Sequence, residues 1–236
     1  MKTLYTLSIF LILTMPIAAQ PLSYNFQKVT TAQEAKDADR KRLLEIGQAM
    51  HAYVRQQGKF PPADMSLLGT HGQLSWRVGL LPYVGQQELY QKFNIQESWD
   101  SPHNLDLVKQ MPDVYQSSGS ILPAGRTNIV APLGQGTTFD PRYRVGLRDV
   151  TDGTSNVAML LRADASQAVI WTSPNDLQID WNRPLGTLAN QPGGEVPLLM
   201  VDGAVLYAPY VISPEMFRGL LKINDGGMID LNSLKK

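Results

Sequence analysis

The longest helical pattern of the chain lies in residues 31–58, which read TAQEAKDADRKRLLEIGQAMHAYVRQQG. Apolar side chains recur there at intervals of three and four, which places them on one face of a helix, and charged side chains occupy the other faces. Thr31 and Glu34 have the spacing of a capping box at the start, and Gly58 suits the end. The sequence therefore predicts an amphipathic helix over residues 32–57 that buries its apolar face.

Beyond this helix, short helical and short strand patterns are separated by Gly, Pro and Asp-Gly turns. Helices are expected at residues 86–93, at residues 101–111 and after residue 213, and strands at residues 128–132, 157–161 and 168–172. The clearest hairpin has arms at residues 198–201 and 204–208, joined by Asp202-Gly203, a dipeptide typical of tight two-residue turns. Residues 32–236 are thus expected to form one α+β domain.

The first 19 residues have the layout of a secretory signal peptide. Lys2 gives a positive start, residues 4–15 form an uncharged and mostly apolar run, and the small residues Ala18 and Ala19 suit cleavage. The run is shorter than the roughly 20 apolar residues that span a bilayer, so export with cleavage is favoured over a buried core helix or an uncleaved anchor. Residues 20–31 are expected to be an irregular polar segment, and the mature protein to be periplasmic or extracellular.

Composition excludes several classes of partner and site. The chain of 236 residues carries 21 basic and 21 acidic side chains, so it has no positive surplus that would attract nucleic acid. Cysteine is absent, which excludes disulfides, thiolate zinc sites and a cysteine nucleophile. No basic amphipathic stretch predicts binding to a membrane surface, and we expect no stable membrane span after signal cleavage.

No motif in the sequence predicts catalysis. Of the three histidines, His51, His71 and His103, none has a second histidine three to five residues away, so no short metal-ligand pair exists. A nucleophile elbow, a phosphate loop and a dinucleotide fingerprint are all missing from the sequence. We therefore predict no catalytic residue, no cofactor-binding residue and no metal ligand, and a protein that is not an enzyme. A triad dispersed along the chain is recognised only by geometry.

Asp-Gly segments are the candidate cation sites. Residues 149–156 cluster Asp149 and Asp152 with several oxygen donors, which calcium prefers. The same residue types also form turns, and the spacing is not that of a calcium helix–loop–helix. A turn is the favoured interpretation, with a calcium site as the alternative. Asp202-Gly203 and residues 224–227 are interpreted in the same way, as a hairpin turn and a helix end.

The four tryptophans divide into two pairs. Trp76 and Trp171 have apolar neighbours and are expected in the core. Trp99 and Trp181 lie in polar surroundings and are the candidates for a recognition surface, because exposed aromatic side chains can stack on sugars or anchor a partner protein.

Several motifs taken in order resemble one family, the prepilin-like or pseudopilin-like domain-of-unknown-function family with an H-x9-DG signature that is expanded in planctomycete bacteria. The resemblance covers about residues 40–228. The matching motifs are LLEIGQAMHAY (43–53), GKFPP (58–62), LSWRV (74–78), LPY (81–83), WDSPHN (99–104), MPDVY (111–115), DGTSN (152–156), WT with DL (171–177), PGG (192–194) and VDGAV (201–205).

The resemblance implies a pilin-like fold, in which the C-terminal part of a long helix packs on an antiparallel sheet, and it supplies no catalytic residue. Three features depart from the family pattern. The chain lacks the usual membrane-anchoring segment after a prepilin leader, and Gln116-Ser117-Ser118 stands where relatives often carry Cys-Pro-Ser. Gln191 lies near the position of the signature histidine, ten residues before Asp202 instead of nine.

Two functions are compatible with these observations. The first is an exported, non-catalytic, pilin-like structural or interaction module whose partners are cell-envelope or secreted proteins. The second is an exported ligand-binding or carbohydrate-active protein that uses Trp99 and Trp181 with carboxylates such as Asp100 and Asp180. The second function requires these side chains to share one pocket, with paired carboxylates about 5 to 10 Å apart.

Overall fold

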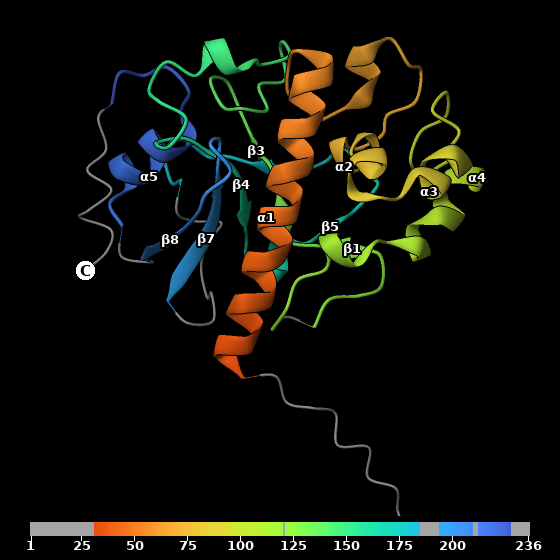
Figure 1. The fold of residues 1–236 in the computed structure, drawn as a ribbon, viewed down its shortest axis with the longest axis horizontal. Coiled ribbons are helices and arrows are strands. Elements are labelled where there is room, and N and C mark those ends of the chain that lie inside the picture. Colours follow the sequence, from red (N-terminus) through yellow and green to blue (C-terminus); the bar gives the residue numbers. More distant parts are fainter. Residues whose placement is uncertain (1–30, 120, 185–193, 210–211, 228–236) are drawn as a thin grey trace, which may run out of the picture.

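A computed structural model describes residues 31–119, 121–184, 194–209 and 212–227. The predicted signal peptide (1–19), all but the last residue of the predicted irregular segment (20–31), and Gln191 lie outside the described residues. The described part is a mixed α+β structure, as expected from the sequence (Figure 1).

The long helix α1 spans Ala32–Gln57, the bounds that the sequence predicts. The Thr31 hydroxyl accepts a hydrogen bond from the Glu34 N–H at 3.1 Å, and the Glu34 carboxylate accepts one from the Thr31 N–H at 2.9 Å. Gly58 ends the helix with φ 73°, a left-handed conformation that favours glycine. Local sequence signals therefore set both ends of α1.

The described strands form three small sheets. Strands β2 (Ile129–Val130), β4 (Ala158–Arg162), β7 (Glu195–Met200) and β8 (Val205–Pro209) form an antiparallel sheet in the order β2-β4-β7-β8. Strands β1 (Arg126–Thr127) and β5 (Val169–Ile170) form an antiparallel pair. Strands β3 (Pro132–Leu133) and β6 (Leu177–Gln178) form a parallel pair.

The predicted hairpin is β7–β8, but its turn differs from the expected two-residue type. The loop has three residues, Val201-Asp202-Gly203, and the Met200 N–H donates to the Ala204 carbonyl across it at 2.8 Å. Gly203 has φ 91°, and its N–H donates to the Met200 carbonyl at 2.9 Å. A left-handed glycine after the turn is the usual way to close a three-residue hairpin loop.

The four-stranded sheet is covered on both faces. Helix α1 packs on β7 and β8, and α5 (Pro214–Leu221) packs on β4 (Figure 1). Along β7 the side chains alternate, so that Leu199 joins the core beneath α1 and Leu198 joins the core beneath α5. Because both faces are buried, the strand sequences are continuous apolar runs, not alternating ones.

Three short α-helices lie on the other side of α1 from the four-stranded sheet (Figure 1). The α-helices are α2 (Trp76–Gly79), α3 (Gln87–Lys92) and α4 (Pro102–Leu105). The 3-10 helices are η1 (Met65–Leu68), η2 (Leu81–Val84), η3 (Asp106–Gln110), η4 (Asp113–Tyr115), η5 (Leu147–Asp149) and η6 (Ala165–Gln167). The predicted helix at 101–111 is therefore α4 continued as the tighter helix η3.

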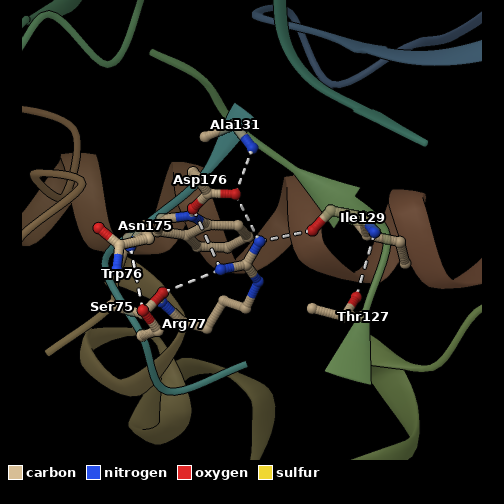
Figure 2. Close-up of polar contacts among 9 residues, drawn as sticks. Ser75, Trp76, Arg77, Thr127, Ile129, Ala131, Asn175 and Asp176 are labelled. Carbon is tan, nitrogen blue, oxygen red and sulfur yellow. Dashed lines mark hydrogen bonds and ion pairs between the residues drawn. The ribbon is translucent and has the colours of Figure 1, made fainter. Parts of the chain in front are cut away.

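A buried ion pair joins this helical side to the strands (Figure 2). The Arg77 guanidinium in α2 contacts the Asp176 carboxylate, with 2.7 Å between Nη2 and Oδ1. The Trp76 indole N–H donates to the same carboxylate at 2.8 Å, and so does the Ala131 N–H at 2.9 Å. Trp76 and Trp171 are fully buried, which confirms their prediction as core residues.

Candidate functional site

A cavity of about 780 Å³ opens at the C-terminal end of α1. Four segments line it: the last turns of α1 with the residues that follow, the turn around η5, Thr154, and the β7–β8 loop. The lining residues are His51, Val54, Arg55, Gly58, Lys59, Gly146, Leu147, Arg148, Asp149, Thr154, Val201 and Asp202. Its size is that of a pocket for a small ligand or a few residues of a peptide.

Hydrogen bonds between the segments hold the walls of the cavity. The Phe60 N–H donates to the Val145 carbonyl at 2.8 Å, which fixes the η5 turn beside the end of α1. The Asp202 N–H donates to the Thr154 carbonyl at 2.9 Å, which fixes the hairpin loop. The cavity is therefore formed by the fold itself and does not depend on a ligand to assemble it.

His51 connects α1 to the hairpin loop. Its Nε2 lies 2.7 Å from the Val201 carbonyl oxygen. Because a carbonyl oxygen only accepts, Nε2 must carry the proton in this bond. The contact places the imidazole at the wall of the cavity, one turn before Arg55 on α1, and joins the helix to the hairpin loop.

Charged side chains of both signs surround the opening, but their partners differ. Arg55, Lys59 and Arg148 are exposed, and no hydrogen bond or ion pair joins these three side chains to another group in the described part of the chain. The carboxylates are engaged: Asp149 accepts from the Gly146 N–H at 2.7 Å and Asp202 from the Ala204 N–H at 2.8 Å. Three cationic and two anionic side chains thus line the opening, a net formal charge of +1.

Three aliphatic side chains line the cavity. Val54 and Val201 are buried there, while Leu147 leaves 44% of its surface exposed beside Arg148. The lining contains no aromatic residue. It has one imidazole, on His51, and one hydroxyl, on Thr154. A lining that combines aliphatic and cationic side chains suits a ligand that has both apolar and anionic groups.

The other two histidines lie away from this cavity. His103 has Nε2 2.7 Å from the Lys92 carbonyl oxygen, which ties α4 to the end of α3. His71 lies in an exposed loop, where its backbone N–H donates to Gln96. Within the residues that the structure describes, no three histidine, aspartate or glutamate side chains gather into a group that could hold a metal ion.

The Asp-Gly segment at residue 152 ties two loops together. The Asp152 carboxylate accepts hydrogen bonds from the N–H groups of Asp225, at 2.7 Å, and Gly226, at 3.1 Å. The Asn156 side-chain amide donates a hydrogen bond to the Asp152 carbonyl at 2.8 Å. The Asn156 contact is that of a local turn, whereas the Asp152 carboxylate joins this turn to the loop at residues 225–226.

Trp99 and Trp181 are not brought together. Trp99 is half-buried against the core next to α4. Trp181 lies beside α5, with the Lys222 ammonium 3.9 Å from the centroid of its ring. Helices α4 and α5 are at opposite edges of the molecule (Figure 1). Asp100 and Asp180, their exposed neighbours, are separated in the same way. None of these four residues lines the 780 Å³ cavity.

Comparison with known proteins gives a family over part of the chain. Residues 40–127 match a family described as "Protein of unknown function (DUF1559)". The match runs from α1 to β1 and confirms the resemblance to a domain-of-unknown-function family over that part. It includes the α1 wall of the cavity and ends before η5 and the hairpin. No curated protein and no solved structure matches the chain.

Proposed function

We propose that this chain is an exported, non-catalytic, pilin-like interaction module that binds cell-envelope or secreted proteins. The arrangement of a long helix on an antiparallel sheet supports the pilin-like part of this proposal. The layout of residues 1–19 supports export. In the part of the chain that the structure describes, no helix has the length and apolar character needed to cross a membrane.

The observation that carries the proposal is the complete burial of the apolar face of α1. Leu43, Ile46 and Met50 each have 0% of their surface exposed, because the sheet and the short helices cover them. A helix covered in this way has no apolar face left for assembly into a helix bundle. This burial supports recognition through the surface of the protein, and the cavity at the end of α1 is the candidate place for it.

The carbohydrate-active alternative receives less support. It depends on Trp99, Trp181 and nearby carboxylates acting in one cleft, and these residues lie at opposite edges of the molecule. The lining of the cavity contains two carboxylates, on Asp149 and Asp202, but no phenylalanine, tyrosine or tryptophan on which a sugar ring could stack. The arrangement of these residues therefore supports binding of a protein partner more than hydrolysis of a sugar.

Export can be tested by the mass of the mature chain. The full sequence is produced in a bacterial host, the envelope fractions are separated, and the intact mass is measured. We expect a soluble periplasmic or extracellular protein that begins close to Ala19 or Gln20. A double variant, Leu11→Arg with Leu13→Arg, should keep the chain uncut in the cytoplasm, because charge interrupts the apolar run. A wild-type chain that retains Met1 in the membrane would contradict export as a free protein.

Interaction can be tested by crosslinking in the same host or in the native envelope. We expect discrete crosslinked products with wild-type protein. The matched variant replaces Arg55, Lys59 and Arg148 by Gln, which changes the cavity opening and leaves the core untouched. Loss of the products in this variant would support binding at the cavity, and unchanged products would place the interaction on another surface.

A further inference from the structure

We propose that the cavity at the end of α1 binds an acidic-aliphatic peptide segment, in which a carboxylate lies next to a branched aliphatic side chain. The inference deepens the proposed interaction function and rests on it. The carboxylate would lie among Arg55, Lys59 and Arg148, and the aliphatic side chain would lie against Val54 and Leu147.

Charge complementarity is the first argument. Three cationic side chains line one opening, and none of them has an ion pair or a hydrogen bond in the described part of the chain. They come from two separate elements, the end of α1 and η5, so a single ligand must lie between those elements to meet them all. Concave walls of low dielectric constant strengthen the field of such a group of charges.

The two carboxylates of the cavity, Asp149 and Asp202, reduce this charge to a net formal +1. Asp149 uses Oδ2 for the Gly146 N–H, and Asp202 uses Oδ1 for the Ala204 N–H. Each retains a second oxygen that can accept a hydrogen bond. A peptide supplies backbone N–H donors at a regular spacing beside its side-chain carboxylate, so it can satisfy the acidic and the basic groups together.

The apolar lining is the second argument, and it favours a peptide over an anionic sugar. Leu147 is 44% exposed, and it lines the cavity together with the buried aliphatic residues Val54 and Val201. A leucine, isoleucine or valine side chain of a ligand could cover this surface. A sugar ring has no aliphatic branch for it, and the lining offers no aromatic face on which a ring could stack.

Two features limit the affinity. The C-terminal end of α1 carries a partial negative charge, which opposes an anion that approaches the helix axis. The three cations are exposed, so salt screens their attraction. We therefore expect a dissociation constant on the order of 0.1–1 mM for a short peptide at low salt, and weaker binding at high salt.

The test uses purified mature protein and the blocked peptide acetyl-Gly-Glu-Leu-Glu-Leu-Gly-amide, titrated by NMR. We expect saturable shifts at the methyl groups of Leu147, Val54 and Val201. The peptide with Gln in place of both Glu should bind at least about tenfold more weakly, because it lacks the charges. Equal binding of the two peptides, or shifts confined to other surfaces, would overturn the proposal.

A charge-matched pair of variants gives the control. The triple variant Arg55→Gln, Lys59→Gln and Arg148→Gln should weaken binding of the acidic peptide by about ten- to a hundredfold. The control triple variant Lys41→Gln, Lys109→Gln and Arg183→Gln has the same net charge and exposed positions away from the cavity, and it should bind within about twofold of wild type. Both variants must have the melting temperature of wild type, since the replaced side chains are exposed.

A separate titration with oligogalacturonate tests whether the cavity binds an anionic sugar instead of a peptide. Binding of oligogalacturonate without binding of the acidic peptide would overturn the peptide assignment and leave an anion site. The experiment does not depend on export or on a cellular partner. If the protein is exported and forms crosslinked products but does not bind the peptide, only this inference is contradicted. If the chain stays in the cytoplasm and forms no crosslinked products, the proposed function is contradicted.

Discussion

Arg77 and Asp176 lie 99 residues apart in the sequence and form an ion pair in which both side chains have 0% of their surface exposed. The guanidinium also donates to the Ile129 carbonyl at 2.7 Å and to the Ser75 hydroxyl at 3.0 Å (Figure 2). The pair therefore binds α2, β2 and the segment before β6 at one point. The family match covers Arg77 and ends at residue 127, so Asp176 lies in the part of the chain beyond it.

Replacement of Asp176 by Asn should lower the free energy of unfolding by about 3–5 kcal/mol, because the buried Arg77 charge loses its partner. The Ala131 N–H and the Trp76 indole would also lose a charged acceptor. Urea denaturation followed by tryptophan fluorescence measures the change. The control is Asp100→Asn at an exposed carboxylate, which should change the free energy by less than about 0.5 kcal/mol. Equal effects of the two replacements would show that the buried pair does not stabilise the fold.

Asp140 should make stability depend on acid pH. Burial by itself raises the pKa of its carboxyl, but hydrogen bonds from Arg142 and from the Gly136 N–H outweigh burial and lower the pKa from 3.8 to about 2. A carboxylate with a lowered folded-state pKa stabilises the protein above its unfolded-state pKa. That stabilisation, of order 2 kcal/mol, is lost as the pH falls from about 4 to about 2.

The measurement compares wild type with Asp140→Asn in urea at several pH values. The variant should be less stable near pH 6, by an amount of order 2 kcal/mol, and the gap should close toward pH 2. Asp100→Asn serves again as the exposed control, with a difference from wild type below about 0.5 kcal/mol. A gap that is constant across this range would mean that Asp140 acts through packing and not through its charge.

Gly47 allows the close approach of α1 to the hairpin. A Cβ atom at this position would lie 3.0 Å from Cδ1 of the buried Leu199. Gly47→Val should therefore lower the free energy of unfolding by about 1–3 kcal/mol through overpacking. Gln48→Val, at an exposed position of the same helix, isolates the cost of a β-branched residue and should lower it by less than about 0.7 kcal/mol. Two equal losses would contradict the packing explanation.

Local signals made part of this fold predictable. The bounds of α1 follow from its apolar period, its capping box and Gly58, all of which act within a few residues. The β7–β8 hairpin was equally visible, although Asp202-Gly203 indicated a two-residue turn and Gly203 instead closes a loop of three. A dipeptide specifies that a turn forms, and the pairing of the flanking strands then sets its length.

The candidate site was less predictable, because its residues are distant in the sequence. The cavity joins the end of α1, the η5 turn and the hairpin loop, and no spacing rule connects these three. Trp99 and Trp181 stand out as tryptophans among polar residues, yet Trp99 packs against the core beneath α1 and Trp181 against the core beneath α5. The sequence does not predict the Arg77–Asp176 pair for the same reason, because an arginine in an apolar stretch does not indicate which carboxylate it contacts.

Asp152 separates the turn interpretation of residues 149–156 from the calcium interpretation. Extracellular calcium sites have dissociation constants of about 0.1–1 mM, so a site of that kind would stabilise the protein by about 1–2 kcal/mol at about 5 mM calcium. For a chain of this size that corresponds to a rise of several degrees in melting temperature. Because the Asp152 oxygens already accept the Asp225 and Gly226 N–H groups, we expect a rise below about 1 °C.

Asp152→Ala completes this test. The variant should lose about 1 kcal/mol of stability with calcium or with a chelator, because the tie to residues 225–226 is cut in either condition. Magnesium at the same concentration controls for ionic strength. A calcium-specific rise in the melting temperature of wild type that disappears in Asp152→Ala would contradict the turn interpretation and establish a cation site at this loop.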